Sequence, residues 1–168
     1  MSAINNMPAT STEQGYLPSN SRETVAGALN GLLADAFTLY IKTKNFHWHV
    51  SGPHFHDYHL LFDAQAAQIL AVTDQIAERV RKSGQATLRS IADIQWRRIL
   101  ADNDQDHVDA VAMLRELRND NVLMVTALHR LKELADEAND NATSALVDDW
   151  TDQAEERAWF LFEAGETK

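Results

Sequence analysis

Residues 50–83 read VSGPHFHDYHLLFDAQAAQILAVTDQIAERVRKS, and this stretch decides the fold. The turn Ser51-Gly52-Pro53 ends the helix before it, because Gly favours a left-handed helix end and Pro cannot continue a helix. Beyond the turn, apolar side chains recur every three or four positions, at Leu61, Phe62, Ala66, Ile69, Leu70, Val72, Ile76 and Val80. This spacing predicts a long amphipathic helix from about His54 or His56 to Ser83.

The sequence on either side of this stretch has the same helical period. Upstream it predicts a helix from about Ser21 to Val50, and Asn20 and Glu23 have the spacing of an N-terminal capping box. Downstream it predicts long helices at about 106–138 and 142–165, with a short helical piece at 91–94 between the pairs. No strand pattern is present. The expected fold is all-α: a four-helix bundle with a short helix in the connection between the second and third long helices.

Composition limits the class of protein. The 168 residues are enough for one bundle domain over 21–168, preceded by a flexible N-terminal tail at 1–20. No Cys is present, which excludes disulfides and thiolate metal sites. The formal charge of −10 disfavours nucleic acid as a partner and suits cations, although an ordinary acidic surface explains it as well. Neither a signal peptide pattern nor an 18-residue apolar run occurs, so we expect a cytoplasmic protein with no membrane partner.

Histidine is concentrated around the turn, with five of the seven residues between His47 and His59. Downstream, His59 and Asp63 are one helical turn apart, and so are Asp74 and Glu78. With His59 at zero, the other three fall at about 40°, 60° and 100° around the helix axis. All four therefore share one stripe of the predicted helix. Imidazole and carboxylate together form a donor set that suits iron in both oxidation states.

Distance along the helix limits how this stripe could bind metal. Asp63 and Asp74 are roughly 16 Å apart on a straight helix, whereas metal bonds to nitrogen and oxygen are about 2 Å long. Either each pair works with other residues of the chain, or a second copy supplies the missing half. A twofold axis near position 68.5 would exchange 59 with 78 and 63 with 74, completing two equivalent sites. Near that centre, small residues would permit close approach or simply favour the helix: Ala64, Ala66, Ala67 and Ala71.

His47 fits the same site, because the midpoint between His47 and His59 is Pro53 in the turn. The two imidazoles should therefore lie at similar height on adjacent antiparallel helices. The alternative for the downstream carboxylates is a solvated face paired with Arg79, Arg81 or Lys82. A dinuclear site inside one bundle is disfavoured, because it uses Glu-x-x-His and no His here has a Glu three residues before it.

The chain resembles the Dps proteins, or miniferritins, over about residues 21–165. The resemblance is carried by KNFHWHVSGP at 44–53, HLLFD at 59–63 and DQIAER at 74–79. It implies a ferritin-like fold and a hollow homo-dodecamer built from twofold dimers, with two irons at each inter-subunit site. By this resemblance one subunit supplies the metal ligands and catalytic residues His47, His59 and Asp63, and the other supplies Asp74 and Glu78.

The activity that the resemblance implies is ferroxidase activity. Hydrogen peroxide or dioxygen would oxidise Fe(II), and the ferric mineral would be stored inside, which protects against oxidative damage; zinc or another divalent metal could substitute for iron. Trp48 and Trp159 resemble aromatic residues near the site and the shell interior, with core packing as the alternative. Candidates for an acidic iron-entry pore are Asp136, Glu137, Asp140, Asp148 and Asp149.

The sequence departs from the family pattern at several positions. His49 stands where Asn is usual, Leu60 and Ala64 stand where acidic residues are common, and His54 and His56 are additional. His49, His54 and His56 form either an auxiliary metal site or an exposed loop. Some members coat DNA through Lys-rich ends, but here the first side-chain cation is Arg22, so DNA binding should be weak or absent. A nucleoid-protecting DNA-binding protein with incidental metal binding is the alternative function.

Overall fold

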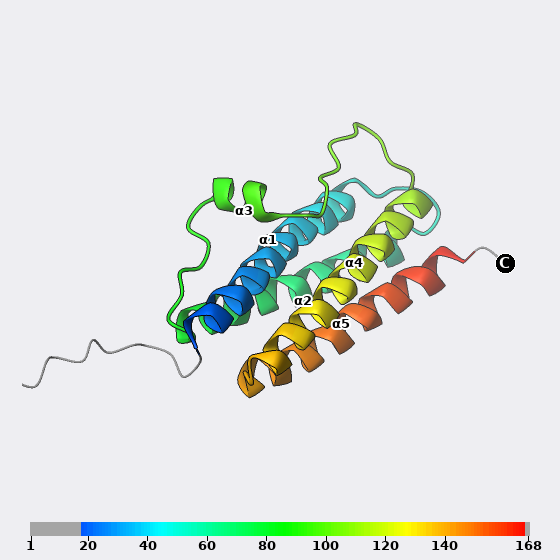
Figure 1. The fold of residues 1–168 in the computed structure, drawn as a ribbon. Coiled ribbons are helices and arrows are strands. Elements are labelled where there is room, and N and C mark those ends of the chain that lie inside the picture. The colour runs from blue at the N-terminus through cyan, green and yellow to red at the C-terminus, as the bar shows by residue number, and fades with distance from the viewer. Residues whose placement is uncertain (1–17, 167–168) are drawn as a thin grey trace, which may run out of the picture.

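The computed structural model describes residues 18–166. Its helices are α1 (Ser19–His49), α2 (Phe55–Lys82), α3 (Ile91–Arg97), α4 (Ala110–Glu137) and α5 (Asn141–Gly165), and this part of the chain contains no strand. In Figure 1 the four long helices lie side by side, and the short α3 interrupts the connection that crosses from α2 to α4. α1 packs along α2, α4 packs along α5, and α1 also contacts α4 and α3. The prediction of an all-α four-helix bundle is confirmed.

The core is formed by the apolar stripes of the four long helices. Its largest fully buried side chains include Leu29, Leu39, Phe46, Phe62, Ile69, Ile76, Leu117, Leu128 and Leu131. Each such side chain stabilises the fold by about 1.5–3 kcal/mol relative to an exposed position. Most of the apolar residues predicted on α2 are buried, but Leu70 is exposed and lies outside the core. α2 therefore has one face in the bundle and the opposite face on the surface.

Two helix starts differ from the prediction. The prediction of a capping box at Asn20 and Glu23 is wrong. α1 begins at Ser19, one residue before Asn20, and the carbonyl of Pro18 accepts the Arg22 N–H at 3.0 Å. Asn20 thus lies inside the helix, where its side chain cannot cap. The predicted start of the third long helix at 106 is also wrong. α4 begins at Ala110, because the carboxylate of Asp109 accepts the Ala112 N–H at 3.0 Å and caps the helix there.

The short helix is longer than the predicted piece at 91–94. α3 runs from Ile91 to Arg97. Ser90 caps its start by accepting the Asp93 N–H at 3.1 Å. The Asp93 carboxylate accepts the N–H of Arg89, the residue before the cap, at 2.8 Å. This second bond reaches one residue further back than the return bond of a capping box.

The predicted tail at 1–20 is only partly open to comparison. Residues 1–17 lie outside the described residues, and Ser19 and Asn20 belong to α1 rather than to a tail. By length and composition alone, α1 is long and apolar enough to cross a membrane. In its most apolar stretch of 18 residues, however, 61% is buried inside the bundle. That burial is the usual situation of a core helix.

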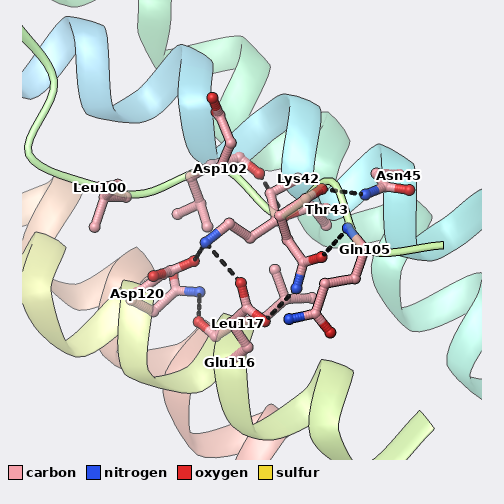
Figure 2. Close-up of polar contacts among 12 residues, drawn as sticks. Lys42, Thr43, Asn45, Leu100, Asp102, Gln105, Glu116, Leu117 and Asp120 are labelled. Atoms are coloured by element: carbon pink, nitrogen blue, oxygen red, sulfur yellow. Dashed lines mark hydrogen bonds and ion pairs between the residues drawn. The ribbon is translucent and has the colours of Figure 1, made fainter. Parts of the chain in front are cut away.

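A charged cluster lies inside the bundle between α1 and α4. Figure 2 shows the ammonium of Lys42 between two carboxylates of α4, at 2.9 Å from Glu116 and 2.8 Å from Asp120. Asn103 of the connection donates to Glu116 at 2.7 Å, and its carbonyl accepts from Asn45 at 3.0 Å. These bonds hold the connection against α1 and α4, close to the end of α1 that carries His47.

Candidate metal centre

The imidazoles of His47 and His59 lie side by side on α1 and α2, at similar height as predicted. Their ring centroids are 3.8 Å apart and the rings are stacked. Nδ1 of His47 is 2.8 Å from the backbone oxygen of His59, and Nδ1 of His59 is 2.9 Å from the backbone oxygen of His47. A neutral imidazole has one N–H, and a carbonyl only accepts, so each Nδ1–H donates and each Nε2 keeps its lone pair. This is the tautomer and orientation that metal-binding His residues use.

Asp63 lies one turn after His59 on the exposed face of α2. Its Oδ1 is 3.8 Å from Nε2 of His47 and 2.7 Å from Nζ of Lys44. The hydrogen bond from Lys44 is the main reason that the pKa of the Asp63 carboxyl lies below its usual value. Asp63 is therefore ionised at neutral pH and faces the same space as the His47 imidazole.

The second carboxylate pair lies further along the same face of α2. Asp74 is exposed, and its carboxylate has no hydrogen bond or ion pair to any of residues 18–166. Glu78 accepts a hydrogen bond from Lys82 at 2.8 Å, which lowers the pKa of Glu78. The salt-bridge alternative thus holds for Glu78 in a single chain. A pair so exposed adds little to stability and leaves the carboxylate open to other partners.

A single chain does not bring the five predicted ligands together. Within residues 18–166 no group of three or more His, Asp or Glu side chains could hold a metal ion. His47, His59 and Asp63 form one partial set, and Asp74 and Glu78 lie elsewhere on the same helix. The exposed face between them carries small side chains at Ala64, Ala67 and Ala71. Ala66, by contrast, is buried in the bundle and cannot contribute to that surface.

The other residues singled out in the sequence have different surroundings. Trp48 and Trp159 are 61% and 58% exposed, so core packing within the chain is wrong for both. His54 and His56 are exposed, and Nδ1 of His49 is 2.8 Å from the carbonyl of Asn45. None of the three belongs to a group that could hold metal in the described part of the chain.

Among the pore candidates, Asp140 is not a solvated acid. Its carboxylate is buried, caps α5 by accepting the Thr143 N–H at 3.1 Å, and pairs with Arg79 at 2.7 Å. Asp136, Glu137, Asp148 and Asp149 are exposed. Asp148 pairs with Lys132 at 3.0 Å.

Lys44 is the residue at this site that the sequence reasoning missed. It precedes His47 by three positions, so both lie on the same face of α1. The spacing places Lys44 and His47 on one face, but it does not identify Asp63 as the partner of Lys44. The contact joins α1 to α2, and helical spacing within one helix does not predict such a contact.

Comparison with known proteins identifies the family of this chain. Residues 26–164 match the Ferritin-like domain family. A DNA protection during starvation protein of Brevibacillus brevis is 31% identical over 140 residues, covering 83% of this chain and 93% of that protein. The X-ray structure of Dps from Thermosynechococcus elongatus has a TM-score of 0.86 at 27% identity, covering 89% of this chain and 95% of that chain. A Dps protein of Vibrio cholerae O1, described as a member of a broad superfamily of ferritin-like diiron-carboxylate proteins, has a TM-score of 0.84 at 25% identity, covering 89% and 94%. The chain therefore belongs to the Dps family of ferritin-like proteins.

Proposed function

We propose that this chain is an iron-oxidising, iron-storing miniferritin of the cytoplasm. Its ferroxidase sites bind Fe(II) between twofold-related copies, hydrogen peroxide or dioxygen accepts the electrons, and ferric mineral collects inside a hollow dodecamer. The observation that carries the proposal is the stacked pair His47 and His59, whose Nδ1–H groups are both used on backbone carbonyls. That arrangement presents two Nε2 lone pairs beside an ionised Asp63 on an open surface.

The separation of the two ligand sets in a single copy supports sharing of the site between copies. Three donors are gathered at one end of the exposed face of α2, while Asp74 and Glu78 lie roughly 16 Å further along the helix. A second copy, crossing antiparallel near position 68.5, would bring its Asp74 and Glu78 to the first copy's imidazoles. The exposed alanines between the two sets leave room for the close approach of two helices. Two equivalent sites per dimer would result.

The chemistry that these ligands support is electron transfer from iron to peroxide. Two Fe(II) ions give one electron each, the O–O bond breaks, and with two waters the products are two ferric oxyhydroxide units and four protons. The carboxylates stabilise the higher charge of Fe(III), and the imidazoles bind as neutral donors. Consuming peroxide and Fe(II) together protects the cell from the radicals that they would otherwise form. Zinc or another divalent ion would occupy the same donors without this reaction.

The test of the proposed function uses two single variants and their mixture. His59→Ala and Glu78→Ala should each abolish rapid Fe(II) oxidation by peroxide while the assembly size stays unchanged. After subunit exchange between the two variants, a mixed dimer has one site with both lesions and one intact site, so partial activity should return. Wild-type rates in His59→Ala would overturn the site assignment. If the mixture of the two variants stays inactive although subunit exchange is demonstrated, the site is not shared between subunits.

DNA protection is the second candidate, because the Brevibacillus brevis relative is named for it. Direct DNA binding is disfavoured here by charge, since twelve copies at −10 each would carry about −120. Protection would then come from removal of iron and peroxide rather than from coating the DNA. Tight retention of plasmid in a gel shift at low salt would contradict this.

A further inference from the structure

The ammonium of Lys44 lies where a metal bound by Asp63 would have to approach. Its Nζ is 2.7 Å from Oδ1 of Asp63, the same oxygen that is 3.8 Å from Nε2 of His47. A metal bonded to Oδ1 and to that nitrogen would lie about 2 Å from each of them. The ammonium and the metal cannot both use this oxygen at such distances without strong repulsion.

Lys44 also differs from an ordinary surface lysine. Its side chain is only 18% exposed, whereas Lys82, the partner of Glu78, is 62% exposed. Partial burial reduces solvent screening, so the charge of Lys44 should act on the site more strongly than that of Lys82. Nζ of Lys44 also lies 5.7 Å from the ring centroid of Trp48, one turn along α1. The ammonium thus lies near the face of this ring while it is bonded to Asp63, and the ring stabilises its charge there.

We propose that Lys44 is a built-in counter-ion that holds Asp63 until metal arrives, and that its displacement sets the affinity of the site for divalent metal. The inference rests on the proposed function, because it takes Asp63 as a ligand. Lys44 is a positioning residue and does not itself coordinate metal. In the empty site its positive charge stands in for that of the metal and holds the Asp63 side chain beside the imidazoles. In the loaded site the ammonium leaves Asp63 for solvent and keeps the face of Trp48 as its neighbour.

The test measures Zn(II) binding to the assembled protein by calorimetry, because zinc reports affinity without oxidation. Lys44→Met keeps the length of the side chain but removes the charge, and it should bind zinc roughly tenfold or more tightly than wild type. Lys44→Arg keeps the charge and should stay within about twofold of wild type. Lys82→Met is the matched control, and the high exposure of this lysine predicts a change of no more than about threefold. Lys44→Gln, another uncharged side chain, should repeat the result of Lys44→Met if the latter assembles poorly.

The outcomes separate this inference from the proposed function. If His59→Ala abolishes zinc binding while both neutral variants bind zinc no more tightly than wild type, the counter-ion role is wrong and the site assignment stands. If wild type and all variants bind no zinc at these residues, the site itself is wrong. If Lys44→Met and Lys44→Arg both bind zinc more tightly than wild type, the positive charge of Lys44 is not what weakens zinc binding. Tighter binding in the two neutral variants alone supports the inference.

Discussion

At the scale of single residues, the bundle contains a lysine that is more deeply buried than any at the candidate site. The side chain of Lys42 is 3% exposed and lies between Glu116 and Asp120 (Figure 2). Burial raises the pKa of Asp120 even though the hydrogen bond from Lys42 opposes that shift. The ionised form of Asp120 is therefore costly inside the fold. Its charge is tolerated because Lys42 is there to compensate it.

Replacing Lys42 should therefore destabilise the fold strongly. Lys42→Met leaves buried carboxylate charge without its partner and should lower the free energy of unfolding by about 3–5 kcal/mol at neutral pH. The raised pKa of Asp120 means that the folded state binds this proton more tightly than the unfolded state, so the cost should shrink as the pH falls. Urea unfolding of wild type and variant at several pH values measures both effects.

Two further variants make the Lys42 prediction specific. Arg130→Met removes an exposed ion pair with Glu133 and should change stability by no more than about 0.5 kcal/mol. Adding Asp120→Asn to Lys42→Met removes the uncompensated charge and should recover part of the loss. A cost for Lys42→Met as small as that of the Arg130 variant would show that the cluster adds little to stability.

At the scale of elements, α5 begins where three helices meet. Asp140 caps α5 by accepting the N–H and the hydroxyl of Thr143, and it also pairs with Arg79 of α2. Burial raises the pKa of Asp140, but the bonds from Thr143 and Arg79 outweigh it and hold the pKa below its ordinary value. One carboxylate thus fixes the start of α5 and its position against α2.

The lowered pKa of Asp140 makes its contribution to the stability of the fold depend on pH. A depressed pKa in the folded state contributes stability above the unfolded value of about 3.9, and this contribution is lost as the pH falls through the folded pKa. Asp140→Asn keeps a good capping side chain but loses the charge facing Arg79, so it should cost about 1–2 kcal/mol at neutral pH. The difference from wild type should narrow below about pH 4. Thermal unfolding between pH 3 and 7 measures it.

The matched control for Asp140 lies on the same helix. Asp148 pairs with Lys132, but its side chain is exposed, so Asp148→Asn should cost no more than about 0.5 kcal/mol at any pH. A loss for Asp140→Asn that stayed constant down to pH 3 would show that the ion pair is not its cause.

The helices were predictable from sequence where periodicity alone determines them. The apolar repeats predict all four long helices. Each repeat extends over many residues, so a single irregular position does not obscure the helical period. Helix starts were less predictable, because each depends on one side chain. Val108 continues the apolar repeat of α4, yet Asp109 caps that helix and excludes 106–109 from it. Asn20 has the right spacing for a cap, but the backbone of Pro18 starts α1 earlier.

At the scale of the whole molecule, the exposed face of α2 determines whether the site can be completed. Spacing alone predicted that His59, Asp63, Asp74 and Glu78 share this face, because helix geometry fixes angles and heights. The reciprocal bonds of His47 and His59 and the contact of Lys44 were not predictable, because they depend on how two helices are placed side by side. The number of copies in the assembly rests on family membership.

A bulky charge at the middle of this face should separate the copies without unfolding them. Ala67 is exposed in the single chain, so Ala67→Arg costs the monomer little. In an antiparallel contact near position 68.5, the same change places each arginine opposite Leu70 of the other copy, with the two arginines about 4.5 Å apart in height along the helices. We expect size-exclusion chromatography to show species far smaller than the about 227 kDa of twelve 18.9 kDa chains, with normal helicity and no rapid Fe(II) oxidation. Ala67→Ser should assemble and react like wild type, and full activity in an Ala67→Arg monomer would contradict a shared site.

The crossed bonds between the two imidazoles also limit how this chain can change over generations. Each ring is anchored to the backbone of the opposite helix, so both remain anchored only while α1 and α2 keep their relative height and rotation. One extra residue in α2 between His59 and the buried Phe62 would rotate His59 by about 100° relative to the packed face of the helix and turn it away from the carbonyl of His47. Substitutions at exposed positions of this turn of α2 are therefore tolerable where insertions are not. The spacing from His59 to Phe62 should be inherited together with the two histidines, and descendants that lose one histidine should be free to lose the other.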